Sequence, residues 1–185
     1  MPRLLTRVGF GAVLVAIALC PPAARAQSGW LRNGKPVTGE PNLGTDGPLA
    51  VIQVSTTDAN GLIAAWPKPT PATLMKGAGT ISSRRLVTTF LIFKGCTPDP
   101  AGACNVTADF EVVDPHGLTA AQRMVPVRVG EKPGRDDGLV LSATGFGLTL
   151  NANNAVGAYH IRATTTDHVA SRSVRTEQIL ILQGK

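Results

Sequence analysis

Aromatic residues, clustered charge and catalytic motifs are scarce in this sequence of 185 residues. Phe, Trp and Tyr make up 4% of the chain, and Arg84 and Arg85 are the only adjacent basic pair. Nucleic-acid-binding surfaces combine clustered basic residues with stacking aromatics, so this class is not expected. No G-x-S-x-G elbow and no glycine-rich phosphate or dinucleotide motif occurs. We therefore expect neither an enzyme nor a cofactor-binding protein.

Cysteine is also scarce, with only Cys20, Cys96 and Cys104. A zinc or redox pair would need further close ligands or a C-x-x-C motif, and neither is present around Cys96 and Cys104. These two residues predict a local disulfide. The chain-entropy model gives so short a loop a stabilisation of roughly 2 to 3 kcal/mol.

The long hydrophobic run of the chain lies at its N-terminus. Arg3 and Arg7 precede an apolar stretch at 8–19, and the small residues Ala24 and Ala26 follow. The stretch is shorter than the roughly 20 residues that a membrane-spanning helix needs. The pattern predicts a secretory signal peptide cleaved after Ala26, with export to the periplasm or medium and no stable membrane insertion afterwards.

Cleavage would leave 159 of the 185 residues, enough for one domain, and would lower the formal net charge from +6 to +3 by removing three arginines. Lipidation of Cys20 is an alternative. It is disfavoured because Leu19 precedes this cysteine and Pro21 follows it.

The remaining chain divides into an irregular N-terminal arm at 27–47 and one β-domain at 48–185. The arm is rich in Gly, Pro and Asn, and Trp30 is expected to pack on the domain surface. Turn signals recur about every ten residues between strand-length runs, and one short helix is expected at 57–66. Strands are predicted at 48–56, 73–75, 80–82, 86–93, 105–113, 124–129, 139–150 (one or two), 157–166 and 172–182.

Two of these strands flank the cysteine pair. The stretch 86–93 is apolar in both registers, which indicates a strand covered on both faces. In the stretch 105–113, Val106 and Phe110 belong to an apolar row that alternates with polar residues, which indicates a half-buried strand. The turn-rich segment CTPDPAGAC joins them. Together they predict a β-hairpin closed by the disulfide.

The run Met124 to Val129 contains a proline and therefore predicts an edge strand. A polar loop follows at 130–138. This edge and loop are where we expect a partner to bind. The candidate partner-binding residues are Arg128, Lys132, Arg135, Asp136 and Asp137. The last two could instead begin a calcium loop, but its other ligands cannot be named.

A metal site is the main chemical alternative. It would draw on His116, His160 and His168 with Asp114 and Asp167, and it requires the turn at 114–117 to meet the loop at 167–171. No close ligand spacing supports it, so no metal is expected.

The run from Asn154 to Tyr159 resembles the tyrosine corner of immunoglobulin-like domains, where a Tyr just inside a late strand bonds back to the preceding turn. Gly157 and Tyr159 are the structural residues that this resemblance implies. Ile161 stands where antibody domains have their second cysteine, so their inter-sheet disulfide is absent.

From about Leu49 to Leu182, the order of segments resembles the β-sandwich modules of macroglobulin-type and other exported bacterial proteins. A group of uncharacterised exported bacterial proteins shares the pattern around Gly95, Cys96 and VTADF. The resemblance implies an all-β fold, an immunoglobulin-like antiparallel β-sandwich with one local hairpin disulfide.

An exported sandwich without catalytic groups is expected to be an accessory or binding module, which offers its sheet edges and loops to an exported or envelope protein. A pilus or adhesin-type subunit, which links its copies by strand exchange, is the alternative.

Overall fold

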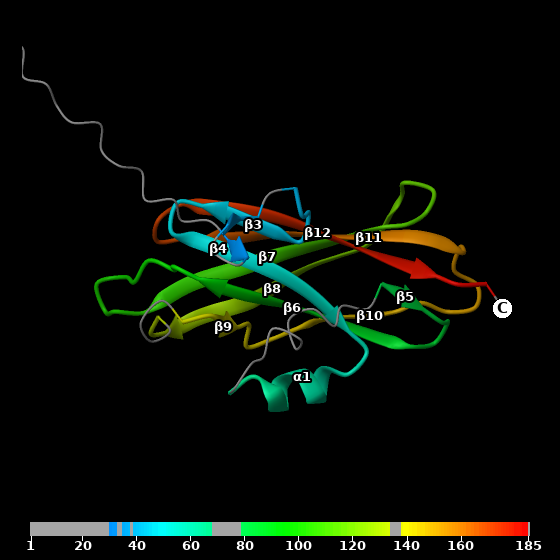
Figure 1. Ribbon diagram of the computed structural model, residues 1–185, viewed down its shortest axis with the longest axis horizontal. Helices are drawn as coiled ribbons and strands as arrows, with labels where there is room; N and C mark the ends of the chain where they lie inside the picture. The colour runs from blue at the N-terminus through cyan, green and yellow to red at the C-terminus, as the bar shows by residue number, and fades with distance from the viewer. Residues whose placement is uncertain (1–29, 33–34, 38, 68–78, 134–137, 185) are drawn as a thin grey trace, which may run out of the picture.

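The computed structural model describes residues 30–32, 35–37, 39–67, 79–133 and 138–184, and shows two large β-sheets packed face to face, with a small two-stranded sheet of β1 and β2 beside them (Figure 1). The predicted signal peptide and the strand predicted at 73–75 lie outside these residues. In chain order the elements are β1 Leu31–Arg32, β2 Lys35–Pro36, β3 Leu43–Asp46, β4 Leu49–Thr56, α1 Ala59–Ala65, β5 Thr80–Ile81, β6 Leu86–Lys94, β7 Cys104–Val113, β8 Thr119–Glu131, β9 Val140–Leu141, β10 Phe146–Thr149, β11 Gly157–Asp167 and β12 Arg172–Leu182.

The two large sheets have different strand orders. One, the β4 sheet, has the order β10-β6-β4-β3, and β9 also pairs with β6. The other, the β11 sheet, has the order β5-β12-β11-β7-β8. All pairs are antiparallel except β5 with β12, which is a short parallel pair. The β-rich, two-sheet architecture predicted from the sequence is therefore confirmed, with one sheet mixed.

The predicted hairpin is wrong. Strand β6 pairs with β4, β9 and β10, whereas β7 pairs with β11 and β8, so the chain crosses from one sheet to the other between them. Each strand has neighbours on both sides and keeps no free edge for the other. The predicted disulfide between Cys96 and Cys104 is present, and it closes this crossover.

The inner faces of both sheets form the core. The row Val106, Ala108, Phe110 and Val112 on β7 is buried, as its alternation predicts. Phe110 stacks on Phe146 of β10 with ring centroids 5.0 Å apart, so this pair joins the two sheets. The stretch 90–93 of β6 is buried in both registers, so this part of the strand is covered on both faces as predicted, whereas Leu86 at its start is exposed.

A buried polar side chain also joins the sheets. Gln53 on β4 is fully buried, and its Nε2 donates to the carbonyl oxygen of Ile161 on β11 at 2.9 Å. The Thr176 hydroxyl on β12 donates to Gln53 Oε1 at 2.8 Å. Both ends of the amide are thus satisfied, as burial of a polar group requires.

Part of the predicted irregular arm is a strand, because β3 pairs with β4. It also lies against β12. A Cβ atom on Gly44 would lie 2.9 Å from the Arg175 carbonyl oxygen, so glycine permits this close approach. The Trp30 indole donates to the carbonyls of Gly44 and Val51 at 3.2 Å each, which packs this residue on the domain as expected.

The segment before β11 turns back on itself. The Tyr159 hydroxyl donates to the Ala155 carbonyl at 2.8 Å, the bond to the preceding turn that the sequence predicted. Burial, and secondly the charge of Asp114, raise the pKa of Tyr159. Gly157 has φ of +136° and lies against Pro115, so the position favours glycine.

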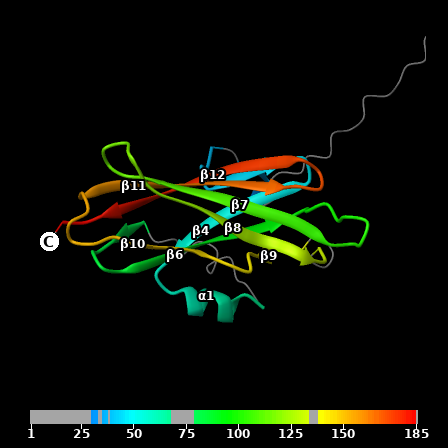
Figure 2. The same ribbon diagram turned by 180° about the vertical axis from the view of Figure 1, so that it is seen from behind.

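The predicted helix is present as α1, which begins after its N-cap Asp58 and lies near β6 and β10, on the opposite side of the molecule from β12 (Figures 1 and 2). The Asp58 carboxylate accepts from the Gly61 N–H at 2.9 Å. Among the described residues, no helix is long and apolar enough to cross a membrane.

Candidate binding site on the edge strand

Strand β8 is the outer strand of the β11 sheet, which confirms the predicted edge position of Met124 to Val129. It is 13 residues long and includes two large hydrophobic side chains that are exposed, Met124 at 65% and Val129 at 52%. A long strand at the edge of a sheet carries backbone donors and acceptors that a neighbouring strand has not used. In β8, such donors and acceptors occur where the backbone groups face away from β7 and no other segment bonds to them.

The alternation of hydrogen bonds across the sheet shows which backbone groups of β8 face outward. Backbone groups of alternate residues in antiparallel strands face alternate neighbours. The N–H of Glu177 on β12 points away from β11, since it donates to the N-terminal segment at 2.7 Å. The cross-strand register runs from Glu177 through Arg162 and Glu111 to Gln122. The backbone groups of Gln122, and of Met124 two residues on, therefore face outward from β8.

Pro126 supports the same orientation. It lies two residues beyond Met124 and opposite Thr107, and it has no N–H to give to β7. Past it, the Val127 carbonyl accepts from the Ala143 N–H at 3.1 Å, so the segment after β9 covers this end of the edge. Among the described residues, only β7 pairs with the stretch Thr119 to Pro126, and we call this stretch the open edge.

The opposite edge of the β11 sheet, at β12 and β5, is covered by other segments. There the Glu177 N–H bonds to Pro41, the Ser173 N–H bonds to the Asp46 carboxylate at 3.1 Å, and β5 pairs with the end of β12. Within the described part of this sheet, the open edge is thus the place where backbone groups are available.

A groove of about 620 Å³ crosses the outer face of the β11 sheet and reaches β8 at Gln122. Its walls come from β7, β11 and β12, with Pro41 beside the last. The charged and polar lining residues are Asp109, Glu111, Gln122, Arg162, Thr164, Arg175, Thr176 and Glu177.

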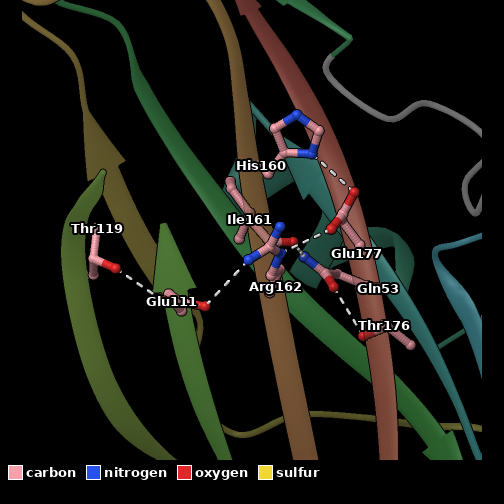
Figure 3. A network of polar contacts seen from close by, with 8 residues as sticks. All are labelled: Gln53, Glu111, Thr119, His160, Ile161, Arg162, Thr176 and Glu177. Carbon is pink, nitrogen blue, oxygen red and sulfur yellow. Dashed lines mark hydrogen bonds and ion pairs between the residues drawn. The ribbon is translucent and has the colours of Figure 1, made fainter. Parts of the chain in front are cut away.

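A row of charged side chains forms the floor (Figure 3). The Arg162 Nε donates to Glu177 Oε2 at 3.0 Å, and its Nη1 lies 3.6 Å from Glu111 Oε2. Glu177 Oε1 contacts His160 Nδ1 at 2.9 Å, and Glu111 Oε1 accepts from the Thr119 hydroxyl at 2.9 Å. His160 and Arg162 therefore lie on the outer face of the β11 sheet.

These contacts shift the pKa values of Glu177 and Arg162. The hydrogen bond to His160, together with Arg162, holds the pKa of Glu177 below its usual value, against the opposing effect of partial burial. The hydrogen bond to Glu177 is the main cause that raises the pKa of Arg162. Glu177 is therefore a carboxylate held by His160 and Arg162. Its pKa is shifted in the direction opposite to that of a general acid.

The candidate partner-binding residues of the edge strand and the 130–138 loop lie beyond the open edge or outside the described residues. Arg128 donates through Nε to the Lys132 carbonyl at 2.7 Å, and its Nη1 pairs with Glu131 at 3.2 Å. It therefore shapes the start of the loop. Lys132 is exposed, and Arg135, Asp136 and Asp137 are not among the described residues.

The alternative metal site required the 114–117 turn to meet the 167–171 loop, and these two segments lie apart. The 114–117 turn follows the end of β7 that pairs with His160, whereas Asp167 pairs with Val106 at the other end. Asp167 accepts instead from the backbone of Thr97, and His168 contacts the Thr107 hydroxyl. No group of three metal-binding side chains occurs in the described ranges.

Sequence reasoning located the edge strand but missed the groove. Asp109, Glu111, Gln122 and Thr119 were not among the predicted site residues. Asp109 and Glu111 occupy polar positions of the β7 alternation, so their shared face could be predicted from period two. Their position beside an open edge depends on the sheet order.

No family model matches the chain, and neither does any curated protein. One similar solved structure is a family 123 glycoside hydrolase from Clostridium perfringens, with 9% identity, TM-score 0.37 and coverage of 73% of this chain. The match spans 28% of the hydrolase. Another is a Niemann-Pick type C2 protein from the Japanese carpenter ant, with 10% identity, TM-score 0.37 and coverage of 79% of this chain and 96% of that one. Such slight similarity identifies neither a family nor a function.

Proposed function

We propose that this protein is an exported, non-catalytic accessory module, immunoglobulin-like in fold, which binds a partner protein by accepting one of its strands at the open edge. The open edge is the observation that carries the proposal. In strand addition, main-chain hydrogen bonds supply affinity and neighbouring side-chain pockets supply specificity. Here the outward-facing backbone of Gln122 and Met124 would provide the first, and the adjoining groove the second.

Export to the periplasm or medium, with cleavage after Ala26, is part of the proposal. The disulfide fits folding in an oxidising compartment. The predicted cleavage also leaves the described β-sandwich intact.

The test is a Met124→Pro variant. Because the Met124 N–H faces outward, proline removes a donor from the open edge without removing a bond to β7. Met124→Ala is the matched control, since it removes the side chain and keeps the N–H. Both variants should retain the wild-type urea midpoint to within a few tenths of a molar, because the site is exposed.

Immobilised mature protein is exposed to the exported proteins of the source organism, and captured proteins are identified by mass spectrometry. We expect one partner that wild type and Met124→Ala retain and Met124→Pro loses. Retention by all three would refute strand addition. Capture of the same chain in concentration-dependent polymers would instead favour the pilus or adhesin-type alternative.

A further inference from the structure

We infer that the partner strand alternates in charge, with Lys or Arg beside Gln122 and Met124 and an acidic residue beside Arg123. This inference rests on the proposed strand addition and names the chemistry of the partner. It follows from the side chains on each face of the open edge.

The outer face favours basic residues. Gln122 and Met124 are uncharged, and directly behind them on β7 lie Glu111 and Asp109. An added strand lies about 4.8 Å from β8, so a Lys or Arg side chain extending over β8 reaches these carboxylates through the groove. Glu111 shares its charge with Arg162, whereas Asp109 is exposed and forms no ion pair with any described residue.

The inner face favours an acidic residue. Arg123 lies opposite Phe110, on the face that carries the core, yet it is exposed. It has no ion pair within the described part of the chain. Successive residues of a strand point to opposite faces. A partner with the order basic, acidic, basic would therefore place every charge beside its complement.

A second copy of this chain does not fit that pattern through its own open edge. The stretch Thr119 to Pro126 contains no acidic residue, so it offers nothing to Arg123. Its flanking outer-face residues are Gln122 and Met124, which are not basic. Pairing of two open edges therefore lacks this charge complementarity, and the inferred occupant is a segment of another protein.

Two synthetic peptides test the inference, Val-Thr-Lys-Glu-Lys-Thr-Val and its charge-swapped form Val-Thr-Glu-Lys-Glu-Thr-Val. Each is labelled and titrated with the mature protein by fluorescence anisotropy. We expect the Lys-Glu-Lys peptide to bind about tenfold more tightly than the swapped peptide, because three exposed charge pairs are attractive in the first complex and repulsive in the second. The preference should largely disappear in 0.5 M NaCl, where exposed charges are screened.

Asp109→Asn should weaken binding of the Lys-Glu-Lys peptide about threefold and leave the swapped peptide no weaker. The matched control is Asp58→Asn, which removes a distant carboxylate while asparagine still caps α1. It should change neither affinity.

The outcomes separate the two proposals. Equal binding of both peptides, lost for both in Met124→Pro, would overturn the charge pattern and keep strand addition. A Lys-Glu-Lys preference that survives in Met124→Pro would overturn strand addition. Failure of both peptides to bind at millimolar concentration would overturn the inferred pattern, and the capture experiment would then decide strand addition alone.

Discussion

Replacement of Gln53 by methionine should lower the free energy of unfolding by about 2 kcal/mol. Methionine keeps the length of the side chain, so the loss comes from hydrogen bonds and not from a cavity. The Thr176 hydroxyl loses its acceptor inside the core, and an unsatisfied buried group costs about 1 to 3 kcal/mol. The Ile161 carbonyl loses less, because the ladder alternation leaves it bonded to Gln178 of β12.

Urea denaturation at neutral pH measures this change, and a double-mutant cycle isolates the pair. Thr176→Val is nearly isosteric, and in the double variant no buried partner remains unsatisfied. The double variant should therefore lose less than the sum of the single variants, with a coupling of about 1 kcal/mol. Gln122→Met, at an exposed site, should stay within about 0.5 kcal/mol of wild type. Strict additivity, or a Gln53→Met variant as stable as wild type, would refute the bridging role.

Three further predictions concern the disulfide, the tyrosine and the charged floor. Replacing Cys96 and Cys104 together by alanine should lower the free energy of unfolding by about 2.5 kcal/mol for this short loop, and an unchanged urea midpoint would contradict it. Tyr159→Phe should cost about 1 kcal/mol by losing its hydrogen bond, whereas a cost below the error of the measurement would leave that bond without a stabilising role. The pKa of Glu177 is lowered by His160, so its contribution is present above the unfolded pKa and is lost as pH falls through the folded pKa. Glu177→Gln should therefore be less stable than wild type at pH 7 and approach it by pH 3, and a gap that does not narrow would disprove the linkage.

Period-two patterns predicted most strands, because burial of one face makes apolar and polar residues alternate along the sequence. The last strand was predicted at 172–182 and is observed there, and the strand predicted at 157–166 is β11, in which Tyr159, Ile161 and Ala163 alternate with polar residues and are buried. The short strand β3 was missed, because Leu43 is its one apolar residue and its close approach to β12 depends on the missing side chain of Gly44. Its position depends on tertiary packing and not on alternation.

The hairpin error has a physical cause that also bears on the site. A turn-rich segment between two strands is compatible with pairing in one sheet or with a crossover between two. The local disulfide between Cys96 and Cys104 fits both, so only the neighbours of β6 and β7 decide. Once β7 lies between β11 and β8, its polar row becomes the floor beside an edge strand.

The open edge could be predicted only in part for the same reason. Pro126 marks β8 as an edge from the sequence, but a proline does not say which stretch of that edge remains uncovered. That depends on Ala143, which reaches Val127 from the other sheet, and on the register that turns Gln122 outward. A variant that lengthens the segment after β9 would release the Val127 carbonyl and extend the open edge. It should then strengthen binding of longer partner strands while leaving short peptides at wild-type affinity, because their contacts end before Pro126.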